Sequence, residues 1–198
     1  MNRPFWLVVA LAVGACEGRQ VAESPPVSPT ASATAKTATA KTATPAPAPT
    51  FSIGEGDEAP DVELTLHDGK TVKLTALEGE LVFIYFYPKD DTPGCTVEAQ
   101  GLRDSYEALT AAGVKVFGVS LQDAESHQAF IDKHELPFPL VVDADGAVAK
   151  AFDVPVKGEY AARHSFLVGK DGKLAKVWRD VTPDGHAAEV LAAAKAAG

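Results

Sequence analysis

The chain has 198 residues, of which 46% are hydrophobic and 23% charged, and its formal net charge is −9. This acidic balance argues against nucleic acid as a partner, because an acidic surface repels phosphate groups. A domain of about 150 residues buries roughly two-thirds of its unfolded surface, so folding requires neither a disulfide nor a metal ion.

The first fifteen residues have the three parts of an export signal. Arg3 supplies the positive charge, residues 5–13 form an apolar run, and Gly14 and Ala15 are the small residues before a cleavage point. The apolar run is too short to span a bilayer, which takes about twenty residues. We therefore predict that residues 1–15 are a signal peptide and that the protein is exported.

Cys16 follows the small residues directly, and two interpretations of it stay open. The segment from Val13 to Cys16 resembles a bacterial lipobox, in which the cysteine receives lipid and becomes the new N-terminus. Ordinary signal cleavage near Ala15 is the alternative, and it leaves Cys16 as a free thiol. On the first interpretation the protein is a lipoprotein anchored to a membrane of the cell envelope, facing the periplasm, and Cys16 takes no part in redox chemistry.

Residues 16–50 have the composition of a linker. They are rich in Ala, Thr and Pro, hold almost no large apolar side chains, and repeat the pentapeptide Ala-Lys-Thr-Ala-Thr between residues 35 and 44. Such a composition cannot offset chain entropy, so we predict a disordered segment that spans about 35 Å as a coil or about 100 Å if extended. It would hold a folded domain, predicted at residues 51–198, away from a membrane.

From residue 51 onward the pattern alternates between strands and helices. Residues 62–66 and 71–74 alternate about the turn at Asp68-Gly69 and predict a hairpin. The apolar run 81–86 predicts a central strand that is covered on both faces. We further expect helices at 93–112, 125–134, 148–152 and 187–196, strands at 114–120 and 139–142, and a second hairpin from 165–168 and 174–178. This order predicts an α/β sandwich with a mixed sheet.

The junction between the strand at 81–86 and the helix at 93–112 holds the only cysteine of residues 51–198. Thr92 is a favoured N-cap residue, Pro93 suits the first helical position, and Cys95 falls at the third. The backbone N–H there has no partner inside the helix, and the positive helix end favours a thiolate. A reactive thiol is expected at such a place.

Cys95 also fits a second interpretation, because buried cysteines are commonly inert core residues. Spacing alone does not decide between a reactive and a core cysteine. The helical stripe that would place it in the core consists of Cys95, Ala99, Leu102, Tyr106 and Leu109.

The pattern Pro88-x-x-x-Thr92-x-x-Cys95 resembles the active-site signature of peroxiredoxins. With Glu98 and residues 101–104 it resembles the bacterioferritin-comigratory, or PrxQ-like, branch of the alkyl hydroperoxide reductase/thiol-specific antioxidant family. The resemblance covers residues 51–198 and implies a thioredoxin-like fold with a mixed central sheet flanked by helices. Further matching positions are 118–120, His127, Phe130, 136–140, Asp143 and 163–166.

The resemblance implies a thiol peroxidase that reduces hydrogen peroxide and organic hydroperoxides in antioxidant defence and redox homeostasis. Cys95 would be the nucleophile and would pass through a sulfenic acid. The hydroxyl of Thr92 and the backbone N–H groups at Gly94 and Cys95 would bind the peroxide oxygens. Pro88 would close the pocket, and Arg163 would contact both the thiolate and the peroxide.

Gln100 stands where many members of this branch carry a resolving cysteine, five residues after the nucleophile. We therefore predict a one-cysteine cycle in which an external thiol, such as glutathione, glutaredoxin or a thioredoxin-like protein, reduces the sulfenic acid. The alternative class of function is an envelope-anchored binding or scaffold domain whose catalytic cycle has decayed.

The remaining polar residues give weaker indications. Glu98 either tethers an arginine or faces solvent. The five histidines lack metal-ligand spacing, so we expect structural or surface roles for them and neither a metal nor a cofactor. We expect the protein to be a monomer or a weak dimer. The histidines are His67, His127, His134, His164 and His186.

Overall fold

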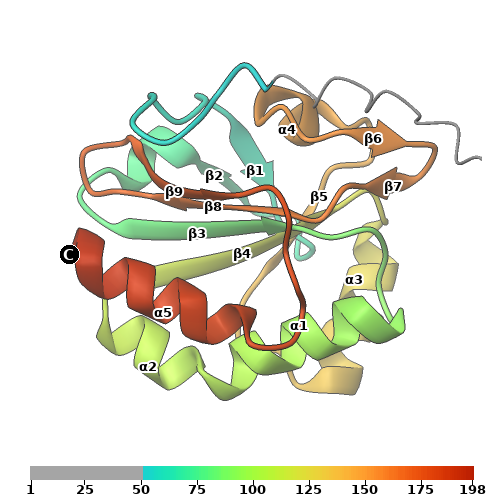
Figure 1. Ribbon diagram of the computed structural model, residues 1–198. Helices are drawn as coiled ribbons and strands as arrows, with labels where there is room; N and C mark the ends of the chain where they lie inside the picture. The colour runs from blue at the N-terminus through green and yellow to red at the C-terminus, as the bar shows by residue number, and fades with distance from the viewer. Residues whose placement is uncertain (1–50) are drawn as a thin grey trace, which may run out of the picture. The chain divides into compact units, whose positions relative to one another are not determined.

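The computed structural model describes residues 51–198 (Figure 1). The predicted signal peptide at 1–15, the predicted lipidation site at Cys16 and the predicted linker at 16–50 lie outside the described residues. Within residues 51–198, none of the helices has the length and apolar character needed to cross a bilayer.

A five-stranded mixed sheet lies at the centre of the domain, with strand order β5-β4-β3-β8-β9. β4 runs parallel to β3 and to β5, whereas β8 runs antiparallel to β3 and to β9. β3 is central and buried along its whole length, as its continuous apolar run predicts. The predicted mixed sheet is therefore confirmed. The strands are β3 (Leu81–Phe86), β4 (Val114–Ser120), β5 (Leu140–Val142), β8 (His164–Val168) and β9 (Leu174–Trp178).

The alternating side chains of β3 divide the core into two apolar clusters, one on each face of the sheet. Phe83 and Tyr85 belong to the cluster between the sheet and α1, α2, α3 and α5, and Val82 and Ile84 belong to the other, beside α4 and the β1–β2 hairpin (Figure 1). Helices thus cover both faces, as in the predicted sandwich. The bounds are α1 (Pro93–Asp104), α2 (Tyr106–Ala111), α3 (Ala124–His134), α4 (Ala147–Ala151), α5 (His186–Ala197), β1 (Glu63–Thr65) and β2 (Thr71–Lys73).

The helix predicted at 93–112 is interrupted at Ser105, so the prediction of one continuous helix is wrong. Ser105 keeps its backbone bond to the carbonyl of Gly101 at 3.1 Å. Its ψ of 1° departs from the helical value of about −42° and separates α1 from α2. Serine is a weaker helix former than alanine or leucine, which is consistent with a break here.

Both predicted hairpins form, as β1–β2 and as β8–β9. Two small elements were not predicted, because segments of two to four residues carry too little periodicity to be recognised. The first is a 3₁₀ helix at Leu74–Leu77, and the second is the hairpin of β6 (Val156–Lys157) and β7 (Tyr160–Ala161). The β6–β7 hairpin leads directly into β8.

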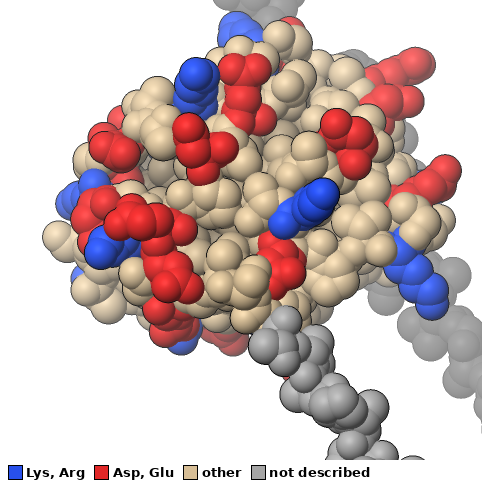
Figure 2. Space-filling model, turned by 90° about the horizontal axis from the view of Figure 1, so that it is seen from above, with Lys and Arg blue, Asp and Glu red and all other residues tan. Residues whose placement is uncertain are grey.

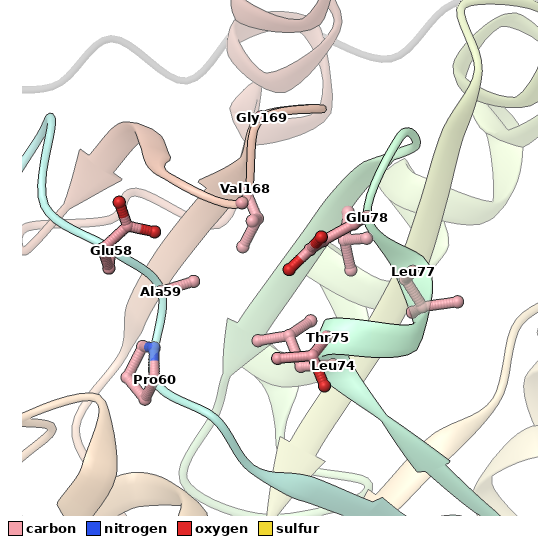
Figure 3. A pocket seen from close by; sticks show the side chains of 11 residues that line it. Glu58, Ala59, Pro60, Leu74, Thr75, Leu77, Glu78, Val168 and Gly169 are labelled. Atoms are coloured by element: carbon pink, nitrogen blue, oxygen red, sulfur yellow. The ribbon is translucent and has the colours of Figure 1, made fainter.

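The pocket in Figure 3 lies on the face of the sheet that is opposite to α1. Leu74, Val82 and Val168, which line it, belong to the cluster on that face, and its volume is about 60 Å³. Glu58 and Glu78 lie on opposite sides of it. On the same side of the molecule, acidic side chains outnumber basic ones (Figure 2). None of the predicted site residues lines this pocket, so the chemistry is expected elsewhere.

Candidate active site

The helix start after β3 has the geometry that the sequence predicts for the thiol. Thr92 is the N-cap residue with φ −85° and ψ 150°, Pro93 is the first helical residue, and Cys95 is the third. The backbone N–H groups of Gly94 and Cys95 therefore have no partner within the helix. Two amide donors are left free beside the sulfur atom.

Thr92 does not cap α1 through its side chain, although its residue type favours that role. Its hydroxyl instead donates to the carbonyl oxygen of Lys89 at 3.2 Å, and its own carbonyl accepts the N–H of Thr96 at 2.8 Å. Because the hydroxyl proton is directed at Lys89, the lone pairs of the oxygen remain free to accept a hydrogen bond from a ligand.

Arg163 reaches the thiol from the start of β8. His164 pairs with Phe86, the last residue of β3, so the preceding Arg163 lies where the loop of residues 88–92 begins. Its Nη2 donates to Sγ of Cys95 at 3.2 Å. The antiparallel pairing of β3 with β8 thus joins two residues that are far apart in the sequence.

Glu98 tethers Arg163, which decides between its two predicted roles. The carboxylate is 1% exposed, and its Oε2 accepts a hydrogen bond from Nη1 of Arg163. Burial raises the pKa of Glu98 to about 7, although the positive charge of Arg163 acts to lower it. Oε1 has no hydrogen-bond partner among the described residues. The carboxyl group therefore gains and loses a proton near neutral pH.

Cys95 is a core residue and a site residue at once. It is 1% exposed and packs in one cluster with Ala99, Leu102 and Leu109, as the helical stripe predicts. An inert core thiol does not need a charged donor, yet Cys95 receives one. Burial opposes the charge of Arg163, but Glu98 and Cys95 outweigh it and raise the pKa of Arg163 above its usual value. The guanidinium beside the sulfur is thus a permanent cation.

A buried hydrogen-bond network lies beneath the loop of residues 88–92, and sequence patterns did not predict it. Nδ1 of His127 lies 2.9 Å from Oδ2 of Asp90, and the hydroxyl groups of Tyr87 and Ser126 donate to the same carboxylate at 2.7 and 2.6 Å. A charged loop residue normally indicates exposure, so no local pattern identifies Asp90 as buried. The position of His127 among the matching family positions was the one signal for this network.

The other predicted residues lie around this centre. Pro88 is half-buried, and its role in closing the pocket stays a prediction. A Cβ added at Gly94 would lie 3.4 Å from Nη2 of Arg163, so the guanidinium passes close to the backbone there. Nε2 of Gln100 lies 3.3 Å from Nδ1 of His134 on α3. Gln100 thus faces a neighbouring helix and not the thiol.

Three of the five histidines are buried within the fold, which confirms a structural role for them: His127, His164 and His186. Nε2 of His186 lies 3.1 Å from the hydroxyl of Ser165. Burial, assisted by the nearby charge of Arg179, lowers the pKa of His164 to about 4. Within residues 51–198, no group of three or more His, Cys, Asp or Glu side chains is arranged to hold a metal ion.

The chain is similar in sequence and in fold to several known proteins. A model of the AhpC/TSA family matches residues 55–177. The chain is 44% identical to peroxiredoxin Bcp of Bacillus subtilis over 148 residues, which cover 71% of this chain and 94% of that protein. Among solved structures, peroxiredoxin Q of Xanthomonas campestris superimposes with a TM-score of 0.67 at 37% identity, covering 74% of this chain and 97% of that chain. The bacterioferritin comigratory protein of the same organism, studied for its alkyl peroxide reduction activity, gives a TM-score of 0.67 at 36% identity over 74% of this chain and 98% of that chain.

Proposed function

The chain belongs to the AhpC/TSA family as a peroxiredoxin of the Bcp/PrxQ kind, a thiol peroxidase, and on this premise we propose that Cys95 is the nucleophile that attacks the peroxide. The observation that carries the proposal is the contact of 3.2 Å between Nη2 of Arg163 and Sγ of Cys95 at the start of α1. A fixed cation and two free amides at this place stabilise negative charge on sulfur and on oxygen.

In the first step the thiolate of Cys95 attacks one peroxide oxygen, and the O–O bond breaks. Sulfur is oxidised to a sulfenic acid, and the other oxygen leaves as an alkoxide or hydroxide that takes up a proton. The amides of Gly94 and Cys95 and the guanidinium of Arg163 are placed to bind the oxygens. The hydroxyl of Thr92, held by Lys89, accepts the O–H of the peroxide.

We propose a one-cysteine cycle for the second half of the reaction. Gln100 occupies the position of the resolving cysteine, and Cys95 is the one cysteine among residues 51–198. An external thiol therefore condenses with the sulfenic acid, releasing water and leaving a mixed disulfide. A second thiol attacks this disulfide, restores Cys95 and leaves as the oxidised form of the reductant. Glutathione, glutaredoxin or a thioredoxin-like protein has the required chemistry.

The test is to treat the purified full chain with one equivalent of hydrogen peroxide, trap sulfenic acid with dimedone and locate the adduct by mass spectrometry. We expect the adduct on Cys95, no adduct in Cys95→Ser, and no intramolecular disulfide. Peroxide consumption in Cys95→Ser at the wild-type rate would disprove the role of Cys95. A disulfide between Cys16 and Cys95 would disprove the one-cysteine cycle alone.

We propose hydrogen peroxide and organic hydroperoxides as substrates. The similar Xanthomonas campestris protein is described by its alkyl peroxide reduction activity. The site is compatible with both kinds of peroxide, because its donors would bind only the two oxygens that all such substrates share. Rate constants for hydrogen peroxide and cumene hydroperoxide, measured on the same wild-type sample, test the proposal.

We also propose that the protein acts in the cell envelope, anchored by lipid on Cys16. The sequence supports this through the apolar run at 5–13, the small residues before Cys16 and the linker that follows. In a bacterial host, the mass of the N-terminal peptide should show cleavage before Cys16 and added acyl chains, and Cys16→Ser should lose them. An unmodified Cys16 in the mature protein would refute the anchor.

A monomer or a weak dimer is our proposal for the state in solution. Val97, Val156 and Tyr160 are the exposed large hydrophobic residues among residues 51–198, and each is only 42–46% exposed. So few apolar side chains do not provide the surface of an obligate dimer. Sedimentation velocity at micromolar concentrations should give a single species of monomer mass.

A further inference from the structure

The loop at residues 88–92 carries a buried carboxylate that the peroxide chemistry described above does not use. Asp90 is 7% exposed and accepts from the hydroxyl of Tyr87 at 2.7 Å and from that of Ser126 at 2.6 Å. Burial acts to raise its pKa, but the hydrogen bonds, first that from His127, hold the pKa of Asp90 below its usual value. An ionised group therefore lies inside the fold at the base of this loop.

His127 faces this carboxylate as a cation. Its side chain is fully buried, with Nδ1 2.9 Å from Oδ2 of Asp90 and Nε2 3.1 Å from the carbonyl oxygen of Val141. Both neighbours are acceptors, and a neutral imidazole has only one N–H to donate. The ring satisfies both only when both nitrogens are protonated. Asp90 and His127 thus form a buried ion pair between the loop and α3.

A second contact joins the same loop to the same helix from the outside. Asp91 has a φ of 58°, a left-handed conformation that side-chain-bearing residues rarely adopt. Its carboxylate pairs with Nζ of Lys133 and with Nε2 of His134, the last two residues of α3. A conformation of this kind persists where its surroundings impose it. α3 therefore holds the loop at two successive residues.

The loop in turn places the groups that surround the thiol. Lys89 precedes Asp90, and its carbonyl oxygen receives the hydroxyl of Thr92 at 3.2 Å. Thr92 then begins α1, whose third residue is Cys95. We propose that Asp90 and His127 are positioning residues: their ion pair fixes the loop so that Thr92 and the first amides of α1 are correctly placed around the sulfur of Cys95. This inference rests on the proposed role of Cys95.

Two reactions of the same thiol separate positioning from other roles. Peroxide reduction needs the donors in place, whereas alkylation by iodoacetamide needs only an accessible thiolate. We expect Asp90→Ala and His127→Ala to lower the rate constant with hydrogen peroxide by about 100-fold, the cost of a misplacement of about 1 Å. Alkylation should not slow, because a loosened loop exposes a sulfur that is buried in the wild type. An unchanged peroxide rate, or an equal fall in both rates, would overturn the proposal.

Asp143→Ala is the matched control, since Asp143 is also buried but its carboxylate bonds α4 and not the loop at residues 88–92. It is 2% exposed and accepts the N–H groups of Val148 and Ala149 at the start of α4, at 2.9 and 2.8 Å. We expect a lower melting temperature and a peroxide rate within about twofold of wild type, as for a change distant from the reacting groups. A loss equal to that of Asp90→Ala would show a general effect of destabilisation and overturn the inference.

Milder variants keep the test decisive if the alanine variants do not fold. Tyr87→Phe and Ser126→Ala each remove one hydrogen bond to Asp90, and each should slow the peroxide reaction by about threefold to tenfold without slowing alkylation. Wild-type peroxide rates in both would overturn the inference. If the wild type itself consumes no peroxide through Cys95, the proposed function falls together with the inference. If the wild type reacts and the variants keep its rate, only the inference falls.

Discussion

The starts of α1 and α3 are built in opposite ways. In α3, the side chain of Asp123 caps the helix by accepting the N–H of Ser126 at 2.8 Å, and the acidic Glu125 lies in the first turn. In α1, Thr92 makes no side-chain cap and the first turn holds no acidic residue. Ser126 and Cys95 occupy the same third position in their helices.

A helix start without a side-chain cap keeps backbone N–H groups free to bind other groups. The positive end of α3 is satisfied by side chains of its own helix, so it is a structural start. The positive end of α1 has no such side chains, and we propose that the thiolate of Cys95 and the oxygens of a peroxide use it instead. The two starts are also connected, because the hydroxyl of Ser126 donates to Asp90 in the loop before α1. The capped start of α3 therefore supports the loop that leads to the uncapped start of α1.

The largest effect is expected from removing the positive charge of Arg163, which lies at the uncapped start of α1. Arg163→Met should lower the rate constant with hydrogen peroxide by about 100-fold to 1000-fold, the range for loss of one charge-stabilising donor. Stopped-flow measurement of peroxide consumption at pH 7 tests this. Glu98 would remain buried without its partner, and it can then stay protonated.

Arg179→Met is the control for loss of a partly buried arginine. Arg179 lies over the ring of Phe51 at 4.1 Å and donates to the carbonyl of Asp153 at 2.9 Å, away from the thiol. It should lose stability and keep the peroxide rate. Equal rate losses in the two variants would mean that Arg163 acts through stability and not on the thiol.

The second prediction concerns Glu98, whose buried carboxyl differs from the exposed Glu125 of α3. Its pKa is about 7 in the folded protein and 4.5 as a free side chain, so the folded state binds the proton more strongly. The free energy of unfolding therefore falls by about 3 kcal/mol as the pH rises from about 4.5 to 7. Because glutamine does not titrate, Glu98→Gln should gain that amount relative to wild type between pH 4.5 and pH 8.

Urea unfolding of wild type and Glu98→Gln at several pH values measures this difference directly. The titration of His164, which has the opposite effect on stability, is common to both proteins and cancels. Glu125→Gln should show no such change with pH. A stability difference between wild type and Glu98→Gln that does not vary with pH would place the pKa of Glu98 near its usual value.

Sequence patterns predicted the strands and the third-position thiol because both follow from local periodicity and helix-start preferences. They did not show which of two roles Glu98 takes, nor that Asp90 and His127 meet, since each depends on which side chain arrives from a distant element. The break at Ser105 was missed for a related reason, because no glycine or proline marks it. Thr92 was predicted to cap α1 from its residue type, but the nearby carbonyl of Lys89 receives its hydroxyl.

The third prediction is that a substitution at the start of α3 lowers stability, whereas a substitution at the start of α1 lowers the peroxide rate. Asp123→Ala should cost about 1 kcal/mol of unfolding free energy, the usual value of a lost cap, and leave the peroxide rate within about twofold. Thr92→Val should cost at most about 1 kcal/mol, since it loses the hydrogen bond to Lys89 but no cap, and it should slow the peroxide reaction about tenfold. Urea unfolding and stopped-flow kinetics on both variants give the four values. If Thr92→Val lost stability and kept its rate, the two starts would be alike.

The smallest expected effect concerns the second helical residue, which is Glu125 in α3 and Gly94 in α1. A Cβ at Gly94 would lie 3.4 Å from Nη2 of Arg163 and 3.7 Å from Cγ of Pro183, both ordinary contacts, so Gly94→Ala should fold and gain up to about 1 kcal/mol. The added methyl group narrows the space between the free amides and the guanidinium. Hydrogen peroxide, the smaller substrate, should lose less than about threefold in rate, whereas cumene hydroperoxide should lose more.

Glu125→Ala should leave the ratio of the two rates unchanged. An unchanged ratio in Gly94→Ala would mean that peroxides approach the thiol without passing this backbone, and that the second position of α1 is open for a reason other than substrate binding.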